Sequence, residues 1–175
     1  MQTLWQTRLM RPAYVAYAGC DIQYHGAPPP TDLVSRLHLV ARTHEGLVVV
    51  CRSVQGWRFL PGGTREPDEP LPHLAARELA EEAGAELRSE IRLFGGHEAI
   101  SRLPAPYRPH LPHPRTYWAY AVAQVEVTGP PTNPDDGEQV VAVTALPPHE
   151  AVAELAKHDA LHADVLAEAI DRGLV

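Results

Sequence analysis

A short acidic helix is the feature that most constrains how this chain of 175 residues folds. The segment from His73 to Gly84 has helical character, and Glu78 and Glu82 share one of its faces, with Glu81 on the neighbouring edge. Like charges at this spacing repel, and two of the acids lie in the last turn, where the helix dipole disfavours anions. Each conflict costs about 0.3–1 kcal/mol. A bound divalent cation would relieve them, because Mg²⁺ takes carboxylate oxygens as ligands.

The same acids could instead form an ordinary solvated helix face. Arg77 stands four residues before Glu81, a spacing at which an ion pair neutralises charge on a helix surface. On the carboxylates alone, the two interpretations are evenly matched. The preceding residues favour the cation site, because Gly63 and Glu69 join the acids in one longer motif.

Residues 63–85 form that motif. The order is Gly63, five residues, Glu69, seven residues, then Arg77-Glu78-Leu79-x-Glu81-Glu82-x-Gly84-Ala85. This resembles the Nudix box, G-x5-E-x7-R-E-U-x-E-E-x-G-U with U aliphatic, and departs from it only in the small Ala85 at the last position. A match of this length is highly specific. The resemblance implies an α/β fold, a Nudix-type α/β/α sandwich with a mixed β-sheet.

The resemblance also implies chemistry and site residues. Nudix hydrolases cleave a nucleoside diphosphate linked to another moiety by attack of water on phosphorus, with Mg²⁺ or Mn²⁺ offsetting the phosphate charge. Glu78 and Glu82 are the expected principal metal ligands, and Glu81 contributes a ligand or holds a metal-bound water. Glu78 is also a candidate general base. A further metal ligand is expected in a late loop, where Glu138 is the first choice and Asp135 and Asp136 are alternatives.

Other residues are expected to orient the catalytic groups and to bind the substrate. The resemblance makes Arg77 and Glu69 an orienting pair, because the arginine fork holds carboxylates in register. Substrate contacts are expected from the loop glycine, from an arginine before it and from a proline-rich loop at 102–115. These candidates are Gly63, Arg58, Tyr107 and Arg108.

The sequence ranks substrates only by elimination. The signatures of the coenzyme A and NADH subfamilies are not matched. A nucleoside tri- or diphosphate is therefore the leading substrate, and ADP-ribose or another nucleotide sugar comes next. The position before Glu69, usually glycine in this family, holds Asp68, and Pro70 follows; both could alter the shape of the catalytic loop.

Two other functional classes are alternatives to a Nudix hydrolase, and the sequence fits each of them less well. A non-catalytic nucleotide-binding Nudix domain typically lacks box carboxylates, and this chain retains them all. An isoprenoid diphosphate isomerase would need a cysteine in the cleft, whereas Cys51 lies in an expected core strand. A zinc site is not expected, because no HExxH pattern occurs.

Apolar periodicity predicts the remaining elements. One internal helix begins near Pro72, with Leu74 and Leu79 towards the core and the acids outward. Residues 1–32 are an N-terminal extension, an extra strand or a dimerisation segment, and residues 33–175 are the Nudix domain. The expected strands are 36–43 and 47–52, joined by a turn, then 91–94, 97–100, 116–127 and 139–144, followed by one terminal helix over 152–170.

Composition limits the partners. A net charge of −7 argues against non-specific binding to nucleic acid, and no apolar run is long enough to span a membrane. Two cysteines outside any metal-ligand pair, with no secretory signal, predict a reducing cytoplasm. We therefore expect a small nucleotide substrate and either a monomer or a homodimer.

Overall fold

The computed structural model describes residues 1–158 and 160–175. The main sheet runs in the order β1 (Ala13–Val15), β2 (Cys20–His25), β8 (Arg92–Ser101), β9 (Arg115–Val127), β3 (Val34–Arg42), β4 (Val48–Ser53) and β10 (Val140–Leu146). Three short strands, β5 (Arg58–Phe59), β6 (Gly62–Thr64) and β7 (Ala85–Leu87), pair with β4, β3 and β9. The helices are α1 (Leu4–Leu9), the 3₁₀ turn Thr31–Leu33, α2 (Leu71–Glu78), a π-turn η2 (Leu79–Ala83), α3 (Pro148–Leu155) and α4 (Ala160–Asp171).

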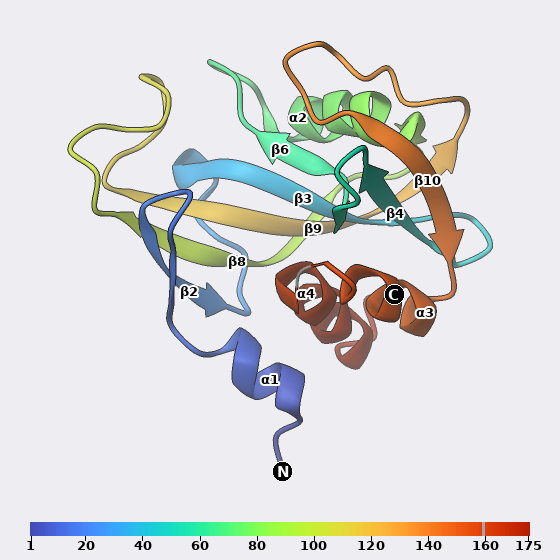
Figure 1. Ribbon diagram of the computed structural model, residues 1–175, viewed down its shortest axis with the longest axis horizontal. Coiled ribbons are helices and arrows are strands. Elements are labelled where there is room, and N and C mark those ends of the chain that lie inside the picture. The colour runs from blue at the N-terminus through green and yellow to red at the C-terminus, as the bar shows by residue number, and fades with distance from the viewer. Residues whose placement is uncertain (159) are drawn as a thin grey trace.

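These elements form three layers. Helix α2 covers one side of the sheet, and α3 with α4 covers the other (Figure 1). Strands β3 and β9 are parallel and the other pairings are antiparallel, so the sheet is mixed. The expected fold class, an α/β/α sandwich with a mixed sheet, is confirmed. No helix among the described residues is long and apolar enough to cross a membrane.

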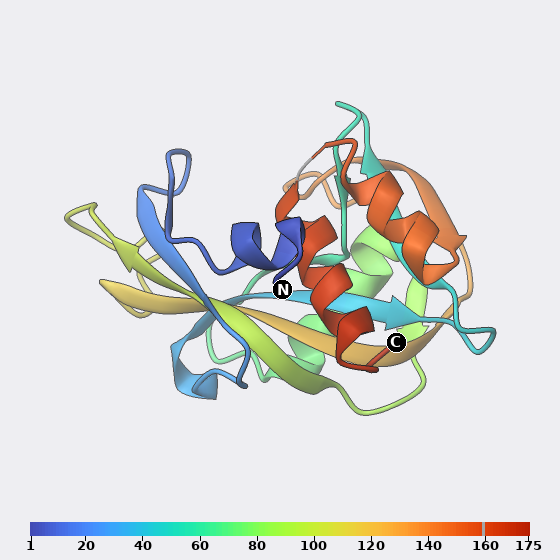
Figure 2. The same ribbon diagram turned by 90° about the horizontal axis from the view of Figure 1, so that it is seen from below.

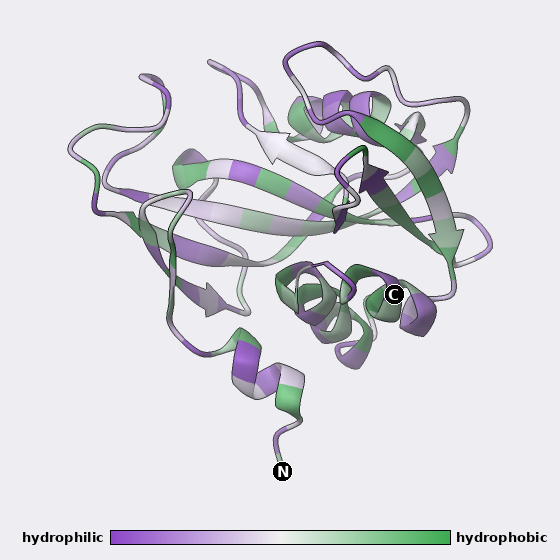
Figure 3. Ribbon diagram, in the orientation of Figure 1, coloured by the Kyte–Doolittle hydropathy of each residue, from purple (hydrophilic) through white to green (hydrophobic). Residues whose placement is uncertain are grey.

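Strand β3 supplies both faces of the core because its side chains alternate. Leu37 and Leu39 are fully buried and pack on the α2 side with Leu79. Val40 points the other way and packs with Leu166 of α4. Figure 3 shows hydrophobic and hydrophilic residues alternating along β3. The side of β3 that faces α4 also carries polar residues, and these become part of the site.

The sheet opens between its two central strands. Strands β3 and β4 are paired at a single position, Arg42 with Val48. Away from that point β3 pairs with β6 and β4 pairs with β5 and β10. The strands therefore diverge, and β6, which carries Gly62, pairs with the part of β3 that β4 does not reach.

Three expectations about the elements were wrong. The strands expected at 91–94 and 97–100 are one strand, β8, which begins at Arg92 and continues through an irregularity between Leu93 and Gly95. The terminal helix is two helices, α3 and α4, which pack together and bury Leu155 and Leu166. The acids of the internal helix do not all face outward, because Glu78 and Glu82 are each only 6% exposed.

The acidic helix also changes its geometry at its end. The last five residues, Leu79–Ala83, form a π-turn that closes on Gly84, whose φ of 57° is left-handed. A π-turn holds one more residue than an α-turn, so the residues that follow are rotated relative to an ideal helix. Leu79 and Ala83 remain fully buried, while Glu82 is directed towards Gly62. A Cβ at Gly84 would lie 2.0 Å from the carbonyl oxygen of Gly129, so only glycine fits there.

The N-terminal residues add to the same fold. β1 lies within the segment expected to form a strand, and β2 pairs with β8. Helix α1 lies beside α4, as both views show (Figures 1 and 2). The guanidinium of Arg8 donates to the carboxylate of Asp164, with Nε to Oδ2 at 2.6 Å. The carboxylate of Asp164 is buried, so this ion pair anchors α1 to α4.

Replacing Arg8 with Met tests this anchor. The change leaves the buried charge of Asp164 without its partner, and we expect the free energy of unfolding to fall by about 1–3 kcal/mol, less than for a fully buried pair because Arg8 is half-exposed. Urea denaturation measures the difference. The control is Arg11→Met, which changes an exposed arginine with no ion pair among the described residues. Equal stability of the two variants would contradict the anchoring role.

Candidate active site

The carboxylates of the acidic helix converge on the glycine loop that enters it. Glu82 Oε2 accepts the N–H of Gly62 at 2.9 Å. Gly62 also pairs with His38 of β3. The hydrogen bond between Gly62 and Glu82 therefore joins the π-turn to the central strand. The side chain of Glu78 lies against Gly63, where an added Cβ would be 2.3 Å from Oε1. A side chain at residue 63 would therefore displace the carboxylate of Glu78 from this position.

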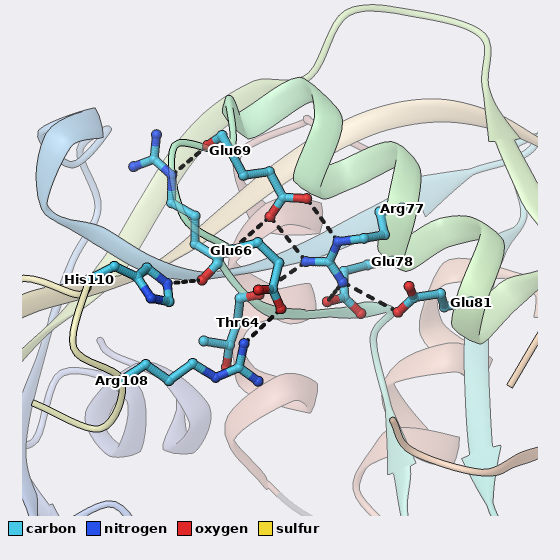
Figure 4. A network of polar contacts seen from close by, with 9 residues as sticks. Thr64, Glu66, Glu69, Arg77, Glu78, Glu81, Arg108 and His110 are labelled. Carbon is cyan, nitrogen blue, oxygen red and sulfur yellow. Dashed lines mark hydrogen bonds and ion pairs between the residues drawn. The ribbon is translucent and has the colours of Figure 1, made fainter. Parts of the chain in front are cut away.

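Arg77 organises the other acids (Figure 4). Its Nε donates to Glu69 Oε1 at 2.8 Å, and its Nη1 donates to Glu78 Oε1 at 2.8 Å and to Glu81 Oε2 at 3.3 Å. Its Nη2 donates to the carbonyl oxygen of Thr64 at 3.1 Å. One guanidinium thus ties the loop to the helix, and the ion pair between Arg77 and Glu81 is present.

Burial dominates the electrostatics of these acids. It raises the pKa of Glu78 to about 7, opposed by the charge of Arg77. Burial raises the pKa of Glu82 well above its ordinary value, and the negative charges of Glu78 and Glu138 add to the effect. Burial also acts to raise the pKa of Glu69. The hydrogen bond and charge of Arg77 act in the opposite direction, and the net effect is a lowered pKa. Two of the acids are therefore ready to hold a proton or a cation near neutral pH.

In the loop between β6 and α2, the residue before Glu69 has a backbone conformation that favours glycine, the residue usual at this position in the family. Asp68 has a φ of 54°, in the left-handed region that favours glycine. Glycine is usual at this position in the family that the motif resembles, and the backbone geometry gives the reason. Aspartate adopts this conformation more readily than most residues, so Glu69 still reaches Arg77.

A cavity of about 760 Å³ opens beside these groups on the α4 side of the sheet. Its size is within the range of about 300–1,000 Å³ usual for small-molecule sites. Glu82 and Glu138 border it together with Gly62. The rest of the lining is mostly aromatic or basic and includes Tyr14, Tyr17, Arg36, His38, Trp57, Arg58, Phe59, Trp118, Tyr120, His158 and His162.

The structure brings some of the expected residues to this cavity. Glu138 borders the same cavity as Glu82, whereas Asp135 and Asp136 are exposed and do not line it. Arg58 also lines the cavity, but its Nε donates to Glu154 Oε1 at 3.1 Å. These placements rank the candidates but leave their roles as predictions.

Two expected substrate contacts do not line this cavity. Tyr107 borders a second cavity of about 350 Å³ under the loop of residues 102–114, and this cavity shares Tyr17, Arg36 and Trp118 with the first. Arg108 donates to Glu66 Oε1 at 2.7 Å, and His110 Nε2 contacts the carbonyl oxygen of Arg65 at 2.7 Å (Figure 4). The proline-rich loop is therefore docked on the box loop, and Arg108 contributes to that docking.

Several cavity residues were not singled out from the sequence. Trp118 and Tyr120 of β9 are buried, and they also line the cavity. Arg36 and His38 are brought beside them by the parallel register of β3 and β9. Only that register reveals the grouping, since the two strands are far apart in sequence.

The donor set fits a divalent cation by its chemistry. Among the residues that the structure describes, no three His, Cys, Asp or Glu side chains are already grouped as ligands. Three of the acids, Glu69, Glu78 and Glu81, form ion pairs with Arg77. However, Glu78 and Glu82 are buried carboxylates with raised pKa values, and the oxygens of such groups are preferred by Mg²⁺.

Replacing Gly63 with Ala tests the packing of this loop against the carboxylate. The new methyl group would displace the carboxylate of Glu78 from its hydrogen bond with Arg77, so we expect the free energy of unfolding to fall by about 0.5–1.5 kcal/mol. Thermal and urea denaturation measure the effect. Gly129→Ala is the matched control, because a Cβ there meets nothing within 4 Å. The interpretation fails if Gly63→Ala is as stable as the control.

Comparisons with known proteins agree with this geometry. The sequence matches the NUDIX domain family over residues 32–169. A Nudix hydrolase from Nitrosomonas europaea is 18% identical with a TM-score of 0.57, covering 80% of this chain and 90% of its own. A mutant of the Bacillus subtilis pyrophosphohydrolase BsRppH is 17% identical with a TM-score of 0.56, covering 78% of this chain and 77% of its own. No curated protein matches the sequence. With the family match and the complete box at residues 63–85, the chain belongs to the Nudix family of hydrolases.

Proposed function

We propose that this protein is a Mg²⁺-dependent hydrolase that cleaves a nucleoside tri- or diphosphate by attack of water on phosphorus. The observation that carries the proposal is the position of Glu82, which joins the buried carboxylates of the box to the aromatic cavity. Family membership supports hydrolysis as the reaction class. The cavity supports a small-molecule substrate with a planar group, because aromatic side chains stack on such groups.

In this proposal the acids hold the cation and Arg77 holds the acids. Glu78 and Glu82 are the principal ligands, Glu81 assists, and Glu138, which borders the same cavity as Glu82, is a further ligand. The cation, when bound, would offset negative charge on the phosphates and orient the water. Glu78 would also accept a proton, since a pKa of about 7 suits a general base at neutral pH. Arg77 and Glu69 keep these side chains in register.

A second candidate substrate is ADP-ribose or another nucleotide sugar. The volume of the cavity and the polar residues of its lining favour it, because a sugar beyond the diphosphate needs space and hydrogen-bonding groups.

We also propose that the protein works in a reducing cytoplasm, which the two free cysteines support.

A substrate panel tests the proposal. Nucleoside tri- and diphosphates, ADP-ribose and nucleotide sugars are each incubated with Mg²⁺ or Mn²⁺, and the released products are identified. We expect turnover of at least one nucleoside phosphate. Turnover of nucleotide sugars alone would transfer the assignment to the second candidate. Binding without turnover of any compound would indicate a non-catalytic Nudix domain.

Replacing Glu82 with Gln should remove metal-dependent turnover. The amide keeps an oxygen that can accept the N–H of Gly62 but loses the charge that binds the cation, so we expect kcat to fall by about 10²–10⁴-fold with the fold intact. Steady-state kinetics measures the loss and circular dichroism checks the fold. The control is Glu90→Gln on the exposed surface. Unchanged turnover in Glu82→Gln would refute the assigned role.

The affinity for the cation should depend on pH. Proton and cation compete for Glu78, and its pKa is about 7, so lowering the pH below about 7 leaves more of the carboxyl group protonated. We expect the apparent affinity for Mn²⁺ to fall about tenfold in total between about pH 8 and pH 6 through Glu78, with the slope steepening below pH 7. Calorimetric titration between about pH 6 and pH 8 measures this. An affinity that stays constant over that range would contradict the competition.

A further inference from the structure

Arg36 forms a stack with two aromatic rings at the end of the cavity that β3, β9 and the N-terminal residues line. Its Cζ lies 4.6 Å from the ring centroid of Trp118 and 5.7 Å from that of Tyr17. Its Nη1 donates to the hydroxyl of Tyr17 at 3.2 Å. Trp118 is the neighbour of Arg36 on the parallel strand β9. The aromatic contacts therefore fix the plane of the guanidinium while leaving most of its donors available.

No carboxylate of residues 1–158 or 160–175 neutralises the charge of Arg36 in an ion pair. The other arginine that lines the cavity, Arg58, is paired with Glu154. His38, its neighbour on β3, is held neutral because burial lowers its pKa well below the ordinary value. Arg36 thus gives this end of the cavity a positive charge that a ligand can complement.

The N-terminal extension builds the wall next to this arginine. Tyr17 follows β1, and Val15 and Ile22 of the β1–β2 pair also border the cavity. The family match begins at residue 32, so this wall lies outside the part of the chain that matches the family. Tyr17 is 80% exposed, so its ring stands at the mouth of the cavity. The extension therefore forms part of the cavity within a single chain.

The stack lies at a defined distance from the box. His38 is paired with Gly62, whose N–H binds Glu82, and Arg36 is two residues further along the same strand. Two residues of a strand span about 7 Å. A ligand that places a diphosphate at the carboxylates can therefore reach Arg36 with the group attached to that diphosphate.

We propose that the Tyr17–Arg36–Trp118 stack is a specificity site that binds an acidic group, a carboxylate or a phosphate, carried by the substrate in addition to the diphosphate that is cleaved. The proposal rests on the proposed function and narrows its substrate class to diphosphate-linked nucleotides with a second acidic group. Arg36 suits this role because a guanidinium presents parallel N–H donors to either kind of oxyanion.

Matched ligand pairs test the proposal and separate the two acidic groups. UDP-glucuronate and UDP-glucose differ by a carboxylate, whereas 2′-phospho-ADP-ribose and ADP-ribose differ by a phosphate. We expect wild-type protein to prefer the acidic member of at least one pair by about tenfold to a hundredfold in Kd. Arg36→Met should abolish that preference, and Arg36→Lys should restore part of it. Calorimetric titration in EDTA gives Kd, and kcat/KM with Mg²⁺ gives an independent value.

Two further variants separate recognition from folding. Tyr17→Leu changes an exposed side chain, so the fold should persist while the preference weakens. Arg115→Met is the matched control, because Arg115 also lies over a tyrosine ring, that of Tyr117, but pairs with Glu98 and borders neither cavity. The control should retain the wild-type preference.

The outcomes are distinct. Equal weakening of both members of a pair by Arg36→Met would mean that Arg36 holds the diphosphate itself, and would overturn the proposal. Absence of any preference in wild-type protein would also overturn it. If no compound is cleaved but the preference in Kd depends on Arg36, the proposed hydrolysis fails and the specificity site stands.

Discussion

The hydrogen bonds of one guanidinium hold the box together. Arg77 contacts carboxylates from the loop, the helix and the π-turn, as well as the carbonyl oxygen of Thr64. Without it, three negative charges would face one another in a partly buried site, which is costly when charges are unpaired. Its pKa is raised by these contacts, so it remains charged at all relevant pH values. The loop, the helix and the acids therefore keep one arrangement.

The site also depends on the divergence of β3 and β4, because the opening between these strands lets a side chain from one side of the sheet reach the cavity on the other side. The box helix packs on one side of the sheet, whereas the cavity lies on the side of α4. A continuous sheet would separate the two. Since the strands share one paired position, the loop around Gly62 enters the gap and Glu82 reaches the cavity from the other side. The π-turn provides the rotation that this contact needs.

The sequence predicted the parts that depend on local spacing. The motif at 63–85 indicated the pairing of Arg77 with Glu69, and alternating apolar residues indicated the strands, since both signals are encoded within short stretches. The burial of Glu78 and Glu82, the π-turn and the grouping of Arg36 with Trp118 depend on how distant segments pack. A helical projection places acids on one face, but it does not say that the face is covered by a glycine loop.

The arrangement of the glycines and acids links stability to chemistry. Gly63 permits the loop to cover Glu78, and this contact removes water from the carboxylate and raises its pKa. In the protein without a cation, the buried carboxyl groups therefore ionise only at a higher pH than in the unfolded chain. Above that pH their buried negative charges lower the free energy of unfolding. A group that binds the ionised acids offsets this loss of stability, because a ligand that binds only the folded state raises the free energy of unfolding. If a cation binds these acids as proposed, it would offset the cost of burying them, and that cost would then be the reason for three acids in the last two turns of the helix.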